Sequence, residues 1–204
     1  MKKTLYFMLF IAVSLLSSCS ETDDENTEFA DWQNRNEAYF MEKYTDVLEK
    51  KAAGATNVDT VRCYSKMPGT KVPTDFIIVE KLNTGTGTVS PIQTDSVRIH
   101  YRGYLMPSDS YQTKMDDGTI VGYQFDSSWV GDYDLALMNP YTGVTGAFID
   151  GFTTALLNMR DGDRWRVYIP QQLGYGESAQ TGIPAFSTLV FDLTLVKHWP
   201  KKLK

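Results

Sequence analysis

Three polar side chains of this sequence stand where they could act on a ligand. Tyr175 lies between two glycines, and an aromatic residue in so flexible a loop suits the edge of a binding site better than a core. Asp126 precedes two serines, so its carboxylate could serve a site or simply cap a turn. His100 alternates with apolar residues, which favours a structural role over that of a general base. Tyr175, whose hydroxyl could donate a hydrogen bond, is therefore the strongest of the three candidates.

A short amphipathic helix is predicted ahead of this tyrosine. Its apolar residues recur at steps of three and four, at Ile149, Phe152, Leu156 and Met159. The pattern stops at Gly162, because glycine readily adopts the left-handed conformation that ends a helix. Such a helix must lay its apolar stripe on a partner, and by spacing alone its bulky residues would belong to a core.

Three segments with alternating apolar residues supply that partner. They cover residues 97–103, 164–169 and 189–196. Pro170 ends the second segment, because proline has no N–H to donate to a neighbouring strand. One helix packed on an antiparallel sheet is the natural arrangement of these elements, and the pattern therefore indicates an α+β fold.

Five motifs now resemble, in order, the signatures of the FKBP-type peptidyl-prolyl cis-trans isomerases. They are VRIHYRGYL (97–105), FDSS (125–128), FIDGF (148–152), LGYG (173–176) and IPA (183–185), the last leading into TLVFD (188–192). The resemblance covers about residues 71–198, and five ordered motifs are far more specific than any single one. It implies an FKBP-like fold, in which a curved antiparallel sheet wraps around one short α-helix.

The resemblance also implies a pocket that accelerates rotation about an Xaa-Pro peptide bond without a metal, a cofactor or a covalent intermediate. The implied catalytic residues are Tyr101, Asp126, Phe152 and Tyr175. The implied substrate-binding residues are Phe125, Phe148, Ile149, Ile183 and Phe191. Phe152 would form the floor of the pocket, where many members of the family have tryptophan. The implied partners are proline-containing polypeptides, and a macrolide inhibitor could occupy the same pocket.

Charge and cysteine content exclude several other functions. The chain has 20 Lys and Arg against 25 Asp and Glu and shows no basic stripe, so we expect no nucleic-acid binding. Cys19 is explained by processing, which leaves Cys63 without a partner for an intrachain disulfide. These two cysteines cannot form a redox motif or a zinc site, and we expect Cys63 to be an unreactive thiol.

The first residues resemble the export signal of a bacterial lipoprotein. Two lysines precede a short apolar run, and the sequence LSSC that ends at Cys19 resembles a lipobox. Cys19 would become the acylated first residue and anchor the protein to a membrane without spanning it. Loss of residues 1–18 removes two lysines and no acids, so the balance becomes 18 minus 25, or −7. We expect a cell-envelope protein, with the serine after Cys19 favouring the outer membrane, on its periplasmic or its surface side.

A second amphipathic helix is predicted after an acidic stretch. Its apolar residues are Phe29, Trp32, Tyr39, Phe40, Tyr44, Val47 and Leu48. This aromatic face could pack on the rest of the chain, on a second copy to form a dimer through residues 29–48, or on a client; we favour the first, because isolated helices are marginal in water. The expected organisation is a signal peptide at 1–18, a tether at 19–28, this helix at 29–54, a linker at 55–70, the isomerase domain at 71–198 and a basic tail at 199–204.

Two segments are longer than the corresponding links of the family, at residues 106–124 and 138–147. Both could border the pocket, and they leave open which residue replaces an aromatic that the family supplies near residues 134–137. We read Gly85 and Gly87 as a hairpin turn. The alternative function is a non-catalytic, FKBP-like chaperone or peptide-binding lipoprotein. A third hypothesis is a nutrient-binding surface protein with a ligand site in the two insertions.

Overall fold

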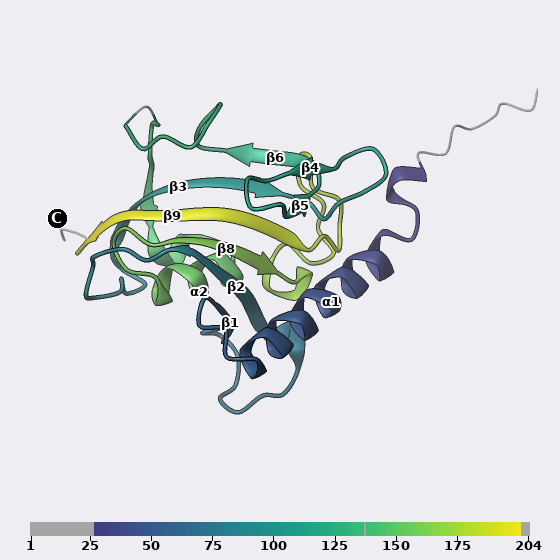
Figure 1. Cartoon of the computed structure of the whole chain (residues 1–204), viewed down its shortest axis with the longest axis horizontal. Coiled ribbons are helices and arrows are strands. Elements are labelled where there is room, and N and C mark those ends of the chain that lie inside the picture. Colours follow the sequence, from purple (N-terminus) through teal and green to yellow (C-terminus); the bar gives the residue numbers. More distant parts are fainter. Residues whose placement is uncertain (1–26, 137, 201–204) are drawn as a thin grey trace, which may run out of the picture.

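The computed structural model describes residues 27–136 and 138–200, and in these ranges the fold is built on one antiparallel sheet. Its strands follow the order β1-β2-β8-β9-β3-β6, and β7 pairs with the same edge of β3 as β6 does (Figure 1). Their bounds are β1 (Val58–Arg62), β2 (Phe76–Asn83), β3 (Ser96–Tyr104), β6 (Gln124–Ser127), β7 (Tyr141–Val144), β8 (Arg164–Ile169) and β9 (Leu189–Trp199). A small hairpin pairs β4 (Thr113–Lys114) with β5 (Ile120–Val121).

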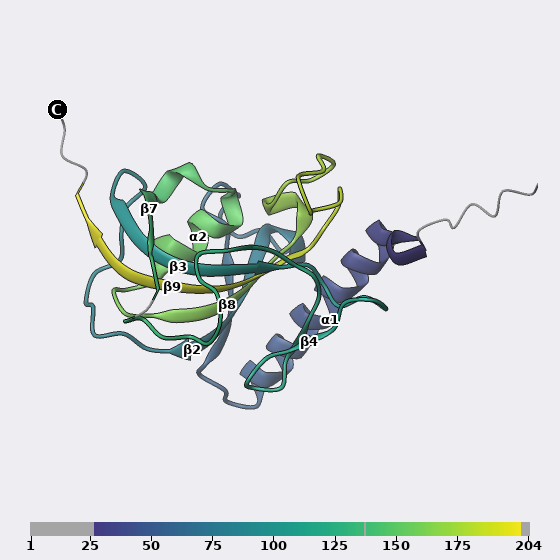
Figure 2. The same ribbon diagram turned by 90° about the horizontal axis from the view of Figure 1, so that it is seen from above.

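Two α-helices cover opposite faces of this sheet. Helix α2 (Asp150–Asn158) lies on the face around which the sheet curves, and α1 (Trp32–Ala52) lies on the other side (Figure 2). Short 3-10 helices at 27–29, 73–75, 145–147 and 171–173 complete the regular structure of the described residues. The α+β fold, the curved antiparallel sheet and the N-terminal helix expected from the sequence are confirmed.

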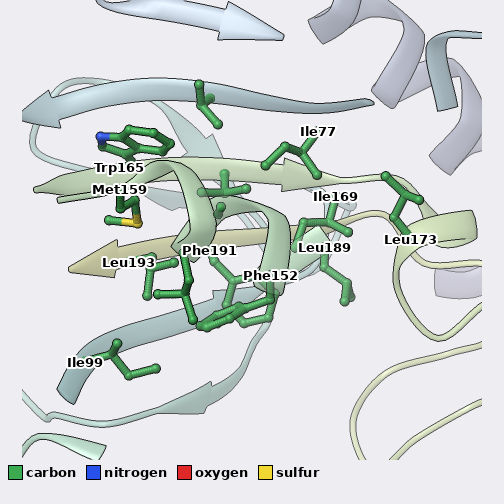
Figure 3. Packing of buried hydrophobic residues seen from close by; sticks show 14 of the residues in the cluster. Ile77, Ile99, Phe152, Met159, Trp165, Ile169, Leu173, Leu189, Phe191 and Leu193 are labelled. Atoms are coloured by element: carbon green, nitrogen blue, oxygen red, sulfur yellow. The ribbon is translucent and has the colours of Figure 1, made fainter. Parts of the chain in front are cut away.

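The strand periodicity sorts residues onto the two faces as predicted. In β8, Trp165, Val167 and Ile169 join the core on the α2 side, whereas Tyr168 joins the cluster under α1. On the α2 side, Phe152 of the helix and Met159, which directly follows it, pack with Phe191, Leu193 and Ile99 of the sheet (Figure 3). Burial of these apolar side chains supplies the main driving force for the fold.

Close packing of α2 on the sheet depends on one glycine. A Cβ atom at Gly151 would lie 2.4 Å from a methyl carbon of Ile169, which is well inside van der Waals contact. The glycine of the motif at 148–152 therefore lets the first turn of α2 approach β8 closely. This approach fixes the position of the helix end that borders the site.

Helix α1 packs on its own sheet, as favoured above, and it is also tied to the loop before β9. Phe40 and Val47 are buried against Ile78 and neighbouring residues of the sheet. The side chain of Asn36 is fully buried and accepts a hydrogen bond from the N–H of Thr188 at 2.8 Å. The helix ends at Ala52, close to the predicted boundary at 54.

Two expectations about connecting segments are wrong. The predicted linker at 55–70 contains β1, which pairs with β2 along Val58–Arg62. This edge strand has only five residues and is mostly half buried, so its sequence shows no clear alternation of apolar and polar residues. Gly85 and Gly87 do not form a hairpin turn, because β2 and β3 are not neighbours in the sheet. They instead pass against the backbone of residues 161–163, where a Cβ at Gly85 would lie 2.1 Å from the carbonyl oxygen of Asp161.

The export signal, Cys19, most of the tether and most of the basic tail lie outside the described residues. Among residues 27–136 and 138–200, no helix combines the length and apolar character needed to cross a bilayer.

Candidate active site

A cavity of about 360 Å³ opens between the N-terminal end of α2 and the sheet. The lining residues are Tyr101, Phe125, Asp126, Tyr141, Ala147, Phe148, Ile149, Phe152, Tyr175 and Phe191. Eight of the nine site residues expected from the sequence are therefore brought together, although they come from five separate segments of the chain. Most of the lining is aromatic, so the cavity can take an apolar group and strip it of water.

The floor of the cavity is a cluster of phenylalanine rings. Phe152 is only 4% exposed, and the centre of its ring lies 5.0 Å from that of Phe191 and 4.8 Å from that of Phe148. Phe125 meets Phe191 edge to face at 5.6 Å. These separations and angles are those at which aromatic pairs attract. The walls are therefore held in place before any ligand arrives.

Gly103 creates the space for two of these rings. A Cβ atom at this position of β3 would lie 2.4 Å from the ring of Phe125 and 2.8 Å from that of Phe191. No side chain larger than hydrogen fits without moving the wall of the cavity. The glycine within the motif at 97–105 is thus explained by the site.

The polar edge of the cavity is a pair formed by Tyr101 and Asp126. The hydroxyl of Tyr101 donates a hydrogen bond to one carboxylate oxygen of Asp126 at 2.8 Å, and the N–H of Ser127 donates to the other at 2.8 Å. Burial, the hydrogen bond to Asp126 and the charge of that carboxylate raise the pKa of Tyr101. Tyr101 therefore stays protonated and holds the carboxylate at the rim.

Tyr175 also borders the cavity, on the loop that follows β8. This loop is closed by hydrogen bonds from the N–H of Gly176 to the carbonyl of Gln171 at 3.0 Å and from the N–H of Phe186 to the carbonyl of Gly176 at 2.7 Å. The side chain remains 39% exposed. Partial burial and, to a smaller extent, the charge of Asp126 raise the pKa of Tyr175, so its hydroxyl remains a donor.

The end of α2 beside the cavity is fastened to the segment that follows β1. The carboxylate of Asp150, the first residue of α2, accepts hydrogen bonds from the hydroxyl of Tyr64 at 2.9 Å and from that of Ser65 at 2.7 Å. Ile149 immediately precedes this residue and lines the cavity. A negative side chain at a helix N-terminus is favourable, and here it also anchors the helix.

Two residues depart from the sequence expectation. Ile183 does not line this cavity: it is buried and borders a neighbouring hollow. Tyr141, which was not predicted, does line the cavity, and its ring lies 6.1 Å from Phe148 and 6.3 Å from Tyr101. It lies in the 138–147 segment and adds one more aromatic ring to the lining. The structure also explains Gly143, where a Cβ would lie 2.9 Å from the ring of Tyr141 and 3.0 Å from that of Phe148.

His100 and Cys63 lie away from the cavity, as expected. His100 is buried beside Trp129 and burial lowers its pKa, so it stays neutral and structural at physiological pH. The thiol of Cys63 is buried against the hydroxyl of Thr154. Within the described part of the chain, no cluster of three or more histidine, cysteine or acidic side chains is arranged to hold a metal ion.

Comparison with known proteins agrees with this architecture. The family described as FKBP-type peptidyl-prolyl cis-trans isomerase matches residues 87–196. The FKBP-type 22 kDa peptidyl-prolyl cis-trans isomerase of Escherichia coli (strain K12) is 34% identical over 72% of this chain and 62% of its own length. FK506-binding protein 1 of Aspergillus oryzae is 32% identical over 59% of this chain and 97% of its own length. The crystal structure of FkpA from Escherichia coli is 26% identical, with a TM-score of 0.55 over 86% of this chain and 64% of that one.

The chain therefore belongs to the FKBP-type peptidyl-prolyl cis-trans isomerase family. It spans between 51% and 62% of the length of the first bacterial relatives that it matches.

Proposed function

We propose that this protein accelerates cis-trans isomerisation of Xaa-Pro bonds in polypeptides. The observation that carries the proposal is one cavity in which buried rings, Asp126 and two tyrosine hydroxyls face the same space. A proline ring matches the apolar part of this space, and the polar rim lies where the neighbouring carbonyl groups would be. Membership of the family supports the same activity.

The reaction needs only a modest lowering of its barrier. Resonance makes the peptide bond planar, with a rotation barrier of ~18–20 kcal/mol, and spontaneous prolyl isomerisation takes ~10–100 s. A turnover of about 10 per second requires roughly 3–4 kcal/mol of barrier lowering. Desolvation and a few well-placed dipoles can supply this amount without covalent chemistry.

The cavity favours the twisted amide over the planar one. The planar amide is the more charge-separated form, so its transfer from water into a ring-lined cavity weakens the ground state more than the transition state. Phe152, Phe191 and Phe125 would hold the proline ring. Only interactions that are stronger in the transition state than in the ground state raise the rate. The rings therefore contribute to catalysis because they destabilise the planar amide more than the twisted one.

The polar groups have distinct roles in the proposal. The hydroxyl of Tyr175 would donate a hydrogen bond to a substrate carbonyl, and the Tyr101–Asp126 pair would set the polarity around the twisting carbonyl. Ile149 lies at the start of α2, where backbone N–H groups lack intrahelical acceptors, so its N–H is a second candidate donor. Phe148 and Tyr141 would close the outer wall.

A protease-coupled assay on an Xaa-Pro peptide tests the proposal. The full chain should raise the rate well above the spontaneous one, and Phe152→Ala should remove most of this gain. A rate equal to the spontaneous one would contradict the proposal. The relative from Aspergillus oryzae is named for binding FK506; we therefore expect a macrolide of this type to compete with the peptide.

The alternative of a non-catalytic chaperone has a different consequence. The middle of the predicted aromatic face, which could have held client chains, packs against the sheet instead: Phe40 and Val47 are buried there, and Tyr39 and Tyr44 are partly buried. A chaperone would therefore have to use the cavity or exposed residues such as Met41 and Leu48. The test is an aggregation assay with a client that contains no proline. If Phe152→Ala suppresses aggregation of this client as efficiently as the wild type does, the chaperone alternative is favoured. The nutrient-binding hypothesis is tested by thermal shifts with a panel of glycans.

We also propose that the protein is exported, acylated at Cys19 and held at the outer membrane. The support is the lysine-led apolar run and the LSSC sequence. Palmitate labelling of the wild type and of Cys19→Ala tests the anchor, and membrane fractionation tests the location. Labelling of both proteins, or of neither, would contradict the anchor.

A dimer through the exposed side of residues 29–48 is a further prediction, which sedimentation velocity checks.

A further inference from the structure

A second hollow, of about 390 Å³, lies beside the candidate active site. Three separate segments of the chain build it: Phe29 in the 3-10 helix before α1, Tyr111 and Tyr123 of the 106–124 insertion, and Gly182 with Ile183 from the loop before β9. None of the described residues that line this hollow carries a charge. It is therefore suited to an apolar or aromatic group.

The two hollows are close neighbours. A Cβ atom at Gly182 would lie 3.4 Å from the ring of Tyr123, which lines the second hollow, and 3.6 Å from the Cβ of Phe125, which lines the first. Tyr123 and Phe125 are two residues apart at the start of β6, a spacing of about 7 Å along extended chain. An extended polypeptide in the first hollow would reach the second within two or three residues.

Aromatic rings remain exposed at this second hollow. Phe29, Tyr111 and Tyr123 are between 38% and 44% exposed, and the rings of the two tyrosines meet edge to face at 5.1 Å. Leu105 and Ile183 form a buried base beneath them. A contiguous exposed aromatic patch with a buried apolar base is typical of a binding surface.

The loop that shapes the hollow is held from behind by α1. The indole N–H of Trp32 donates to the hydroxyl of Ser187 at 2.9 Å, and this hydroxyl donates to the carbonyl of Pro184 at 2.7 Å. Thr188 is bonded to Asn36 through both its N–H and its hydroxyl. The hollow is therefore formed before a ligand binds, which lowers the entropy cost of binding.

We propose that this hollow is a substrate subsite, which takes an aromatic or large apolar side chain two or three residues from the isomerised proline. The inference rests on the proposed function, because a polypeptide bound in the first hollow lies close enough to place one of its own side chains in the second. The subsite gives the protein a preference for proline segments that also carry an aromatic residue, as unfolded chains often do.

The test uses the full chain and Ala-rich peptides of equal length with one Xaa-Pro bond. One peptide has no aromatic residue, and the others carry one Phe at two, three or four residues from proline on either side. We expect at least one Phe position to raise kcat/KM about fivefold to tenfold over the peptide without Phe, mainly through KM. Tyr111→Ala and Tyr123→Ala should each reduce this ratio to below about twofold. Ile120→Ala, an exposed residue of the same insertion outside the hollow, should leave the ratio unchanged.

Several results would overturn the proposal. One is a ratio near one for every Phe position in the wild type, and another is a ratio that the tyrosine variants do not reduce. A wild-type dimer that Tyr123→Ala dissociates would assign the hollow to a second copy. Protection from proteolysis before Thr27 that Tyr123→Ala removes would assign it to the chain's own N-terminal segment.

Failure of the proposed function gives a different result from failure of the subsite. If no peptide is isomerised, the proposed activity fails, and binding of the labelled Phe peptides by anisotropy becomes the readout. Preferential binding of a Phe peptide that Tyr111→Ala weakens about fivefold would still support the subsite. Equal binding of all the peptides would reject it.

Discussion

The two faces of the sheet are covered by helices of very different length, and this difference explains why the ring-lined cavity lies on the α2 face. Helix α1 has 21 residues and shares its face with the β4–β5 hairpin, whose Val121 packs in the same cluster. Helix α2 has 9 residues, or about 14 Å, beneath a strand β9 of 11 residues, or about 36 Å. The short helix leaves part of its face uncovered, and the uncovered part is the ring-lined cavity.

The two faces also treat polar groups differently. Under α1 and the hairpin, the buried guanidinium of Arg166 donates to Asp117 at 2.6 Å and to Thr119 at 2.7 Å, with Glu80 at 3.6 Å. These groups satisfy one another and close the face. On the α2 side, the polar groups of Tyr101, Asp126 and Tyr175 lie at the rim of an open space. One face is thus built for stability, and the other leaves surface available for a substrate.

The largest expected effect compares one phenylalanine from each face. Phe152→Ala and Phe40→Ala remove rings that are 4% and 1% exposed, so each should lower the free energy of unfolding by about 3–5 kcal/mol. Denaturant unfolding measures both. Only Phe152→Ala should also lower kcat/KM per folded molecule, by about 100-fold or more. Equal activity of the two folded variants would break the distinction between the faces.

The next effect concerns the ion pair that closes the α1 face. Arg166→Met should cost about 2 kcal/mol of stability, less than the ~3–5 kcal/mol lost when a fully buried pair is broken, because the side chain of Asp117 is 43% exposed and can regain water. The isomerase rate of the folded protein should not change. Lys50→Met removes the exposed pair with Asp46 and should cost less than about 0.5 kcal/mol in the same unfolding experiment.

A smaller effect compares two tyrosine hydroxyls. Tyr175→Phe should lower kcat/KM about fivefold to tenfold and leave stability nearly unchanged, because its side chain is partly exposed at the rim. Tyr168→Phe removes a hydrogen bond to Glu80 at 3.2 Å on the other face and should cost about 1 kcal/mol of stability with the rate intact. Peptide assays measure the rate and unfolding curves measure the stability. A loss of rate in Tyr168→Phe with an unchanged rate in Tyr175→Phe would count against the assignment of Tyr175.

The smallest expected effect is that of pH. Burial raises the pKa of both Tyr101 and Tyr175 above the usual value of about 10, so both hydroxyls stay protonated donors throughout the range from pH 7 to 9. The value of kcat/KM should vary less than twofold over this range. The stability that these raised pKa values provide is complete below about pH 10 and is lost as pH rises through the folded-state values. A steep fall in rate between pH 7 and 9 would show that another group titrates.

The sequence was most informative where a periodic pattern or an ordered motif was long. The alternation in β3, β8 and β9 predicted which residues face α2, and the motif at 148–152 predicted the helix that borders the cavity. Eight of nine expected site residues line one cavity for this reason. Prediction failed where the local pattern was weak. Strand β1 has only five residues and lies at the edge of the sheet. Gly85 is required because its backbone packs against that of residues 161–163, which are far away in the sequence.

The sequence by itself determined the class of fold, the two helices and the set of aromatic residues available for a site, because side-chain periodicity and ordered motifs are local properties. Only the tertiary structure decided that Tyr141 enters the active-site cavity, that Ile183 lies in the neighbouring hollow, and that α1 supports the loop between them. These outcomes depend on contacts between segments far apart in the chain, and a linear pattern carries no record of which distant surfaces will meet.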